Sequence, residues 1–229
     1  MSKLTIYHGS EYIIQKPTYG LGKIHNDFGL GFYCTEYEEL AKEWACSSLS
    51  GGYANRYTIE TGGLNILRIN SSEFNILNWI AVLVANRLFK IKTPVANRAK
   101  RYLTEHFYLD VNAYDIITGY RADDSYFDFA DAFLNNAITV KQLAYAMRLG
   151  KLGEQIVIKS PQAFEALQFE GYSKAEPNIY YPLRKSRDTS ATQEYLKILD
   201  QEEDGLYMAD IMREKVKQDD PRLSRNISE

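Results

Sequence analysis

The sequence IYHGS at residues 6–10 ends a short run of apolar residues, and GLGFYCT at residues 29–35 contains a second such run. Short apolar runs bounded by turn residues are typical of buried β-strands. A third segment, LAKEWA at residues 40–45, has apolar positions with the spacing of an amphipathic helix. The first fifty residues therefore predict a strand over 4–7, a second strand over 29–35 and a helix over 36–46.

A further short strand is predicted after Glu154, where LGEQIVI spans residues 152–158. That strand covers residues 155–159, and other strand predictions cover residues 57–59, 64–69 and 115–120. Helices are predicted over residues 72–88, 94–108, 126–134 and 139–150, and from Pro161 onward. The TVKQ sequence at residues 139–142 has the pattern of a capping box, and Ser160 precedes a proline that suits a first helical turn.

The domain prediction is a core at residues 1–170 with a helical insertion at about 72–110. A C-terminal helical extension at residues 171–217 and a flexible tail at 218–229 follow. Within the extension, residues 185–191 have the composition of a polar linker, and a second capping box begins at Ser190. Helices are predicted near residues 195–199 and 206–217.

The composition indicates a globular protein with no general affinity for polyanions. The chain has 229 residues, 45% of them hydrophobic, and a formal net charge of -3. Its two cysteines make no disulfide framework, and no charged-then-apolar signal segment opens the sequence. The longest apolar run, residues 79–85, is far shorter than the roughly 20 residues that span a bilayer. These features predict a soluble protein of the reducing cytoplasm, with no membrane partner.

Taken together, the His8-Gly9 pair, Tyr33 after paired glycines and Glu154 at the start of a strand resemble the signature of the ADP-ribosyltransferases. Their order and setting are similar to the His-Tyr-Glu branch, which includes diphtheria toxin and the poly-ADP-ribose polymerases. The whole chain looks most like an uncharacterised bacterial family of that clan. The resemblance implies an α+β fold, a split mixed β-sheet with an NAD cleft between its halves.

The resemblance also implies roles for individual residues. Glu154, His8 and Tyr33 are the expected catalytic residues, and no metal is expected. The residues expected to bind NAD are His8, Gly9, Ser10, Tyr33, Trp44 and Arg121. Fixed negative charge stabilises the sugar cation that forms when nicotinamide leaves, and an aromatic face stacks on the pyridinium ring. Gly9 would let the backbone approach the nicotinamide amide.

Each of these residues also has an ordinary structural interpretation. Glu154 alone would be a solvated strand-edge residue, His8 a structural histidine and Trp44 part of the core. Arg121 would reach a diphosphate, or it would form a salt bridge that fixes a turn. Ala41 replaces the serine that polymerases use to bind the carboxamide. At position 152, where arginine-specific relatives carry Glu or Gln, this chain has leucine, so arginine is not the expected acceptor.

Two surfaces are predicted from residue type alone. Six cations without an intervening acidic residue form a basic stretch, which is either an acceptor-guiding surface or an ordinary solvated face. They are Arg87, Lys90, Lys92, Arg98, Lys100 and Arg101. The segment LYMADIM at residues 206–212 would offer an apolar surface to an antitoxin or regulatory protein. The sequence DFG at 27–29 and the GxG pairs complete neither a kinase nor a Rossmann motif.

The function predicted from the resemblance is ADP-ribosyl transfer from NAD, adding a single unit to a protein or nucleic acid, in a toxin or regulatory role. Two alternatives remain open from the sequence. In an NAD glycohydrolase, water replaces the acceptor. In a catalytically silent module, the same site binds NAD or a partner without chemistry.

Overall fold

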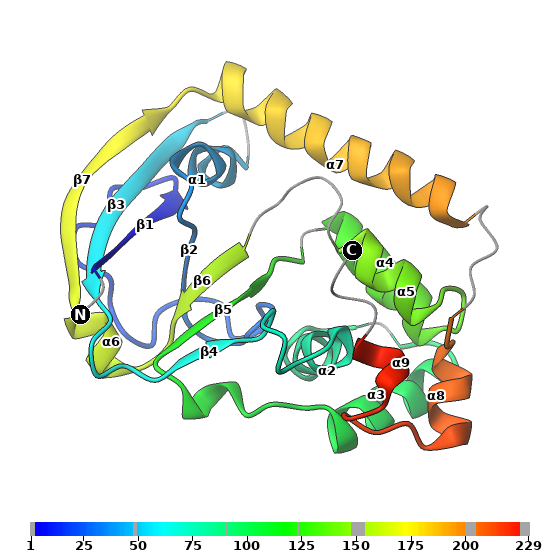
Figure 1. The fold of residues 1–229 in the computed structure, drawn as a ribbon. Coiled ribbons are helices and arrows are strands. Elements are labelled where there is room, and N and C mark those ends of the chain that lie inside the picture. Colours follow the sequence, from blue (N-terminus) through cyan, green and yellow to red (C-terminus); the bar gives the residue numbers. More distant parts are fainter. Residues whose placement is uncertain are drawn as a thin grey trace.

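The computed structural model describes residues 3–47, 50–89, 91–122, 124–147, 154–199 and 205–224. The fold is mixed α+β and contains two small β-sheets (Figure 1). The sheets lie on one side of the molecule, and most of the helices gather on the other. A long helix, α7, crosses from the sheets to the helices.

The first sheet is three-stranded and antiparallel, with β3 in its centre. It consists of β1 (Lys3–Ser10), β3 (Gly52–Glu60) and β7 (Leu167–Ala175). The sequence predicted only residues 57–59 of β3, which is much longer, and it predicted no strand at the position of β7. Since β7 continues to Ala175, the first sheet includes residues beyond the predicted core boundary at 170.

The second sheet has the order β2-β6-β5-β4 and is mixed, because only β4 and β5 are parallel. Its strands are β2 (Phe32–Cys34), β6 (Glu154–Ile158), β5 (Ile116–Tyr120) and β4 (Ile66–Arg68). β2 is shorter than predicted, since a turn precedes it at Gly29, whose φ is 73°. A bridge between Tyr7 and Thr35 joins the two sheets through backbone hydrogen bonds of 2.7 and 2.9 Å.

Helix α1 (Glu38–Ala45) packs on β1 and β3. The larger hydrophobic core lies under the helices on the other side and includes Trp79. Those helices are α2 (Ile76–Asn86), α3 (Pro94–His106), α4 (Asp124–Leu134) and α5 (Val140–Ala146). The predicted capping box is confirmed, because Thr139 and Gln142 each accept from the other's backbone N–H. α2 begins later than predicted, after Asn75, which caps it.

Short elements connect these parts. They are the 3-10 helix η1 (Val111–Ala113) and α6 (Pro161–Glu165). The predicted Ser160 cap is confirmed, because its hydroxyl accepts from the Ala163 N–H at 3.1 Å. The predicted insertion at about 72–110 contains α2 and α3, which pack on each other.

The C-terminal region differs most from the sequence prediction. α7 (Pro177–Leu199) is one helix, so the polar linker at 185–191 and the capping box from Ser190 are wrong. α8 (Met208–Glu214) buries Met208 and Ile211 in the larger core, and these side chains therefore offer no exposed surface to a partner. The described part of the predicted tail contains α9 (Pro221–Ser224), and Gln218 exchanges hydrogen bonds with Asn78.

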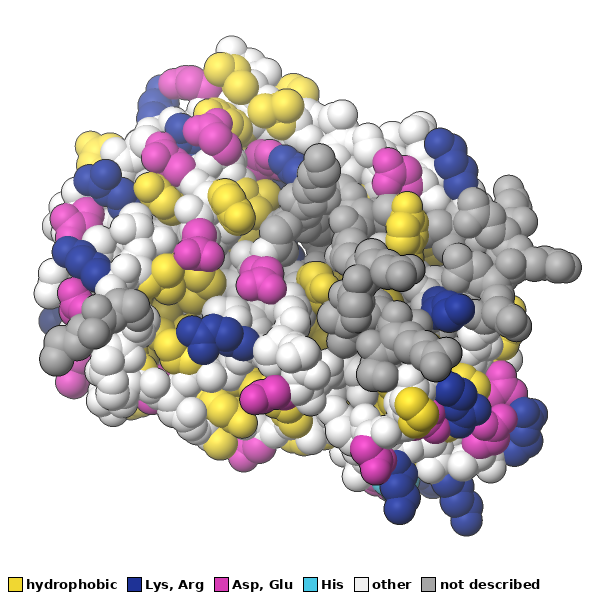
Figure 2. Space-filling model, in the orientation of Figure 1, with side chains coloured by type: hydrophobic (Ala, Val, Ile, Leu, Met, Phe, Trp, Pro, Cys, Tyr) yellow, Lys and Arg dark blue, Asp and Glu magenta, His cyan; other side chains and the backbone are white. Residues whose placement is uncertain are grey.

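Acidic and basic side chains are interspersed where α3, α8 and α9 form one corner of the surface (Figure 2). None of the helices in the described ranges combines the length and apolar character needed to cross a membrane. Cys34 and Cys46 are both buried as free thiols, and burial raises the pKa of each.

Candidate functional site

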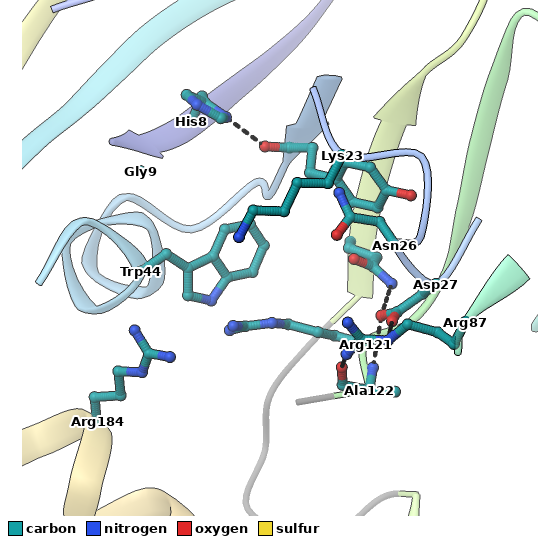
Figure 3. Close-up of a pocket in the computed structure, with 12 residues that line it drawn as sticks. His8, Gly9, Lys23, Asn26, Asp27, Trp44, Arg87, Arg121, Ala122 and Arg184 are labelled. Atoms are coloured by element: carbon teal, nitrogen blue, oxygen red, sulfur yellow. Dashed lines mark hydrogen bonds and ion pairs between the residues drawn. The ribbon is translucent and has the colours of Figure 1, made fainter. Parts of the chain in front are cut away.

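A cavity of about 310 Å³ opens where β1 and α1 face the second sheet and α7 (Figure 3). It adjoins a larger cavity of about 1010 Å³, and the two share His8, Tyr33, Trp44 and Arg121 among their lining residues. These residues come from β1, β2, α1 and the end of β5. The structure therefore brings together side chains that are far apart in the sequence.

Gly9 forms part of the cavity wall, and its lack of a side chain has a packing reason. A Cβ at this position would lie 2.1 Å from the Ala41 carbonyl oxygen and 2.8 Å from the Trp44 Cβ. Glycine is thus needed for α1 to sit directly on β1, which sets the position of Trp44 at the cavity. From the sequence, the predicted reason for Gly9 was close approach of the nicotinamide amide to the backbone, whereas the structure gives a reason in helix packing.

His8 is held by contacts on two sides. Its Nδ1 lies 2.7 Å from the Tyr33 carbonyl oxygen, and its ring stacks on Phe32 at 4.2 Å between centroids. Because a carbonyl oxygen only accepts, Nδ1 carries the proton and Nε2 remains an acceptor in the neutral ring. Burial lowers the pKa of His8, which favours this neutral form near pH 7.

Tyr33 is fixed through its hydroxyl. The hydroxyl donates to the Gly29 carbonyl at 2.5 Å and accepts from the Phe28 N–H at 3.1 Å. Burial is the main reason that the pKa of this phenol is raised far above its ordinary value. Tyr33 therefore stays protonated and ties the turn before β2 to the cavity wall.

The opposite wall is built around Asp27, a buried carboxylate that sequence analysis had considered only within a failed kinase motif. One of its oxygens lies 3.0 Å from Arg87 Nε, and the other accepts from the Ala122 N–H and Gln155 Nε2 at 2.9 and 2.8 Å. Burial raises the pKa of Asp27, and Arg87 is the largest opposing influence. This network connects the loop before β2, α2, β5 and β6.

Arg87 belongs to this buried network, which removes it from the predicted basic stretch. It also donates to the Ala122 carbonyl at 3.0 Å and lines the cavity. Lys90 lies outside the described residues. The other members of the stretch lie on or just before α3, and Lys92, Arg98 and Arg101 are exposed.

Four basic residues line the smaller cavity. They are Lys23, Arg87, Arg121 and Arg184. Among the described lining residues, Asp27 is the one acidic side chain. Arg121 stacks over Trp44, with its guanidinium carbon 4.5 Å from the ring centroid. The cavity thus combines aromatic faces with an excess of positive charge, a combination suited to a phosphorylated aromatic ligand.

Glu154 is the predicted site residue that neither cavity includes in its lining. Its Oε1 accepts from Asn70 Nδ2 at 2.9 Å, and the residue is exposed at the start of β6. Strand alternation turns the next residue, Gln155, into the cavity wall instead. Glu154 still pairs in register with Tyr120, the residue before Arg121, so its backbone lies at the margin of the site.

The other predicted site residues lie at the two cavities. His8, Gly9, Tyr33, Trp44 and Arg121 line the smaller cavity, and Ser10 lines the larger one. Sequence analysis missed Asp27, Gln155 and Arg184. Asp27 precedes a glycine turn, which is a weak local signal, whereas nothing local marks Arg184 in the middle of a long polar helix.

Comparison with known proteins places the chain in a family. The sequence model of a family described as "Protein of unknown function (DUF3990)" matches residues 4–169. The chain belongs to this family. The DUF3990 match contains the strands of both sheets up to Phe169, the third residue of β7, and ends before α7, so Arg184 reaches the cavity from outside the matched region. Neither a curated protein nor a solved structure matches the chain.

Proposed function

We propose that the chain binds NAD in this cleft and transfers ADP-ribose from it to an acceptor. The observation that carries the proposal is the convergence of His8, Gly9, Tyr33 and Trp44 on one cavity that also contains basic side chains. Three of these residues, His8, Gly9 and Tyr33, belong to the sequence signature that resembles the His-Tyr-Glu ADP-ribosyltransferases. Their common location supports the proposal.

In the proposed complex, His8 Nε2 accepts a hydrogen bond from a ribose hydroxyl, since Nδ1 is engaged with the Tyr33 carbonyl. The aromatic side chains Tyr33 and Trp44 provide faces for the nicotinamide ring. The basic side chains neutralise the diphosphate. Because His8 and Tyr33 are each held by their own hydrogen bonds, their side chains would contact the bound NAD without first rearranging.

The reaction breaks the bond between the nicotinamide nitrogen and ribose C1′, and nicotinamide leaves with the bonding electron pair. Negative charge near the resulting sugar cation lowers the barrier, and Glu154 is the proposed source of that charge. To act, its carboxylate would leave Asn70 and turn toward the cleft margin. The acceptor then bonds to C1′ and loses a proton, and water in that position gives the glycohydrolase reaction.

A catalytically silent NAD-binding module is the second candidate, and one observation favours it. The Glu154 carboxylate is hydrogen-bonded to Asn70 rather than lining the cavity. Asp27, the acidic side chain that does line the smaller cavity, is paired with Arg87. In this arrangement neither carboxylate is free to face a ribose.

The test is Glu154→Gln, which removes the charge but keeps the side-chain size. If Glu154 stabilises the sugar cation, nicotinamide release should fall by about 100-fold or more while NAD affinity by calorimetry changes little. Glu60→Gln, an exposed change at the end of β3, is the matched control and should release nicotinamide at the wild-type rate.

Three outcomes separate the candidates. Near-normal release by Glu154→Gln would contradict the catalytic role. NAD binding without nicotinamide release by the wild-type protein would establish the silent module. Labelled NAD incubated with a lysate then separates the reactions, because transfer labels a macromolecule and hydrolysis does not. Sensitivity of that label to nuclease or protease identifies the class of acceptor.

A further inference from the structure

Helix α7 is anchored at both ends to different parts of the molecule. Near its start, the Tyr180 hydroxyl donates to the Glu39 carboxylate of α1 at 2.8 Å, and at its midpoint Arg187 donates two hydrogen bonds to Glu43 of α1, at 2.9 and 2.6 Å. Near its end, Tyr195 is buried against Phe129 of α4, with ring centroids 4.1 Å apart. Figure 1 shows the helix spanning from α1 to α4 and α5. The segment between Tyr180 and Arg187, which contains Arg184, therefore has a defined position beside the cavity.

Arg184 extends from this fixed helix into the site. It lines both cavities, and Figure 3 shows its guanidinium on the same side as Trp44 and the end of Arg121. Within the described residues, no carboxylate lies within ion-pair distance of Arg184 or of Lys23. The charge of Arg184 is thus directed at the cavity and not neutralised by a described neighbour.

Trp44 supplies a second, independent observation. Its indole N–H is buried and has no hydrogen-bond acceptor among the described residues. Leaving a buried donor unpaired carries a desolvation cost, which an acceptor atom of a bound molecule would relieve. The Arg121 guanidinium stacks over the same indole at 4.5 Å. An acceptor beside this N–H would therefore also lie close to positive charge.

We propose that Arg184, Arg121 and the Trp44 indole N–H form a subsite for the diphosphate of a nucleotide, and that α7 is part of the binding site. Guanidinium forks match the paired oxygens of phosphates, and the indole supplies a single directed donor. The cations lie inside a cavity of about 310 Å³ rather than on an open surface, which favours a small phosphorylated ligand over a nucleic-acid strand. The inference rests on the proposed function for the identity of the ligand as NAD.

The probe is ADP, with adenosine as the comparison that lacks phosphate. Calorimetry on the full chain should show ADP binding to the wild type at least tenfold more tightly than adenosine. Arg184→Gln should weaken ADP binding roughly tenfold to a hundredfold and leave adenosine binding unchanged. Lys185→Gln is the matched control, because it removes one charge from the adjacent, exposed residue on the same helix, which does not line the cavities.

A second variant tests the indole separately. Trp44→Phe keeps an aromatic face for Arg121 but removes the N–H donor, and it should weaken ADP binding about fivefold with the fold intact by circular dichroism. Inorganic pyrophosphate should compete with ADP if the diphosphate alone is recognised. Equal ADP affinity in wild type, Arg184→Gln and Lys185→Gln would overturn the subsite, as would equal affinity for ADP and adenosine.

These outcomes are separable from the fate of the proposed function. If the protein binds ADP through Arg184 but neither binds NAD nor releases nicotinamide, the subsite stands and NAD use is wrong. If nicotinamide is released at the same rate by wild type and Arg184→Gln, and their ADP affinities agree, NAD use stands and the α7 subsite is wrong.

Discussion

The two walls of the cavity are built on different physical principles. The wall formed by β1 and α1 is a packing contact, in which Gly9 allows a helix to sit on a strand and sets the position of Trp44. The opposite wall is a buried polar network centred on Asp27, which joins Arg87, Ala122 and Gln155. The first wall requires that residue 9 have no side chain. The second requires that Asp27 and the three groups that contact it all be present.

The two walls should therefore respond differently to mutation. A packing contact is disturbed by an added methyl group, and the neighbouring helix can move to relieve the clash. A buried ion pair with shared hydrogen bonds loses several interactions at once when its central carboxylate is removed, and the remaining cation is left without its partner. We therefore expect the polar wall to be more sensitive to a single change.

Removing Asp27 should produce the largest effect. Asp27→Ala removes one acceptor from Arg87, from the Ala122 N–H and from the Gln155 amide, and should lower the free energy of unfolding by about 3 to 5 kcal/mol. Urea denaturation measures this change. The control Asp131→Ala, at an exposed position of α4, should stay within about 0.5 kcal/mol of wild type. Equal stability of the two variants would mean that the network contributes nothing.

The packing wall is tested by Gly9→Ala. The added Cβ would collide with the Ala41 carbonyl, so α1 must shift, and unfolding free energy should fall by about 1 to 3 kcal/mol. Ser10→Ala, on the next residue of β1, loses only the hydrogen bond from the Tyr12 N–H and should cost less than about 1 kcal/mol. A loss with Gly9→Ala greater than that with Asp27→Ala would reverse the comparison of the walls.

Tyr33 contributes to both walls, and two variants separate its ring from its hydroxyl. Tyr33→Phe leaves the Phe28 N–H and Gly29 carbonyl unpaired and should lower unfolding free energy by roughly 1 to 2 kcal/mol. It should bind NAD nearly as well as wild type, because the ring remains. Tyr33→Ala should in addition weaken NAD binding by about 1 to 3 kcal/mol. Equal loss of affinity in both variants would show that the ring face does not contact NAD.

The smallest effect is a pH dependence from His8. Burial lowers its pKa below the ordinary value of 6.5, so the unfolded chain takes up the proton first as pH falls. Unfolding free energy should therefore decrease as pH is lowered from about 7 through this range, and less steeply in His8→Phe. His106→Phe, an exposed change on α3, should keep the wild-type slope. An identical slope in all three proteins would show that His8 titrates alike in both states.

The elements that the sequence predicted well are those with local signals. The Thr139 capping box and the Ser160 cap were correctly placed, because a cap needs only residues three positions apart. β7 was missed although residues 167–170 alternate as a half-buried strand does, because Gly171 follows and beyond it the exposed Tyr172 and the half-buried Ser173 reverse the expected pattern. The sequence predicted a polar linker at 185–191, whereas α7 runs through this segment and contacts α1 through Arg187 and α4 through Tyr195.

The sequence by itself determined most of the aromatic half of the candidate site. His8, Gly9, Tyr33 and Trp44 lie within or next to short apolar segments whose strand and helix character can be read from neighbouring residues. Apart from Arg121, which the sequence also predicted, only the tertiary structure decided the charged half. Asp27 meets Ala122 and Gln155 across 95 and 128 positions of sequence, and Arg184 enters from a helix beyond the family match.

The tertiary structure also decided which side of β6 faces the cavity. Side chains alternate along a strand, so a single step in register exchanges Glu154 for Gln155 in the wall. Local sequence indicates that a strand is present here, but its pairing with β2 and β5 sets which residues point inward. That pairing depends on contacts between segments that are distant in the sequence. Hydrophobic periodicity within one segment does not indicate which other strand it pairs with, or in which register.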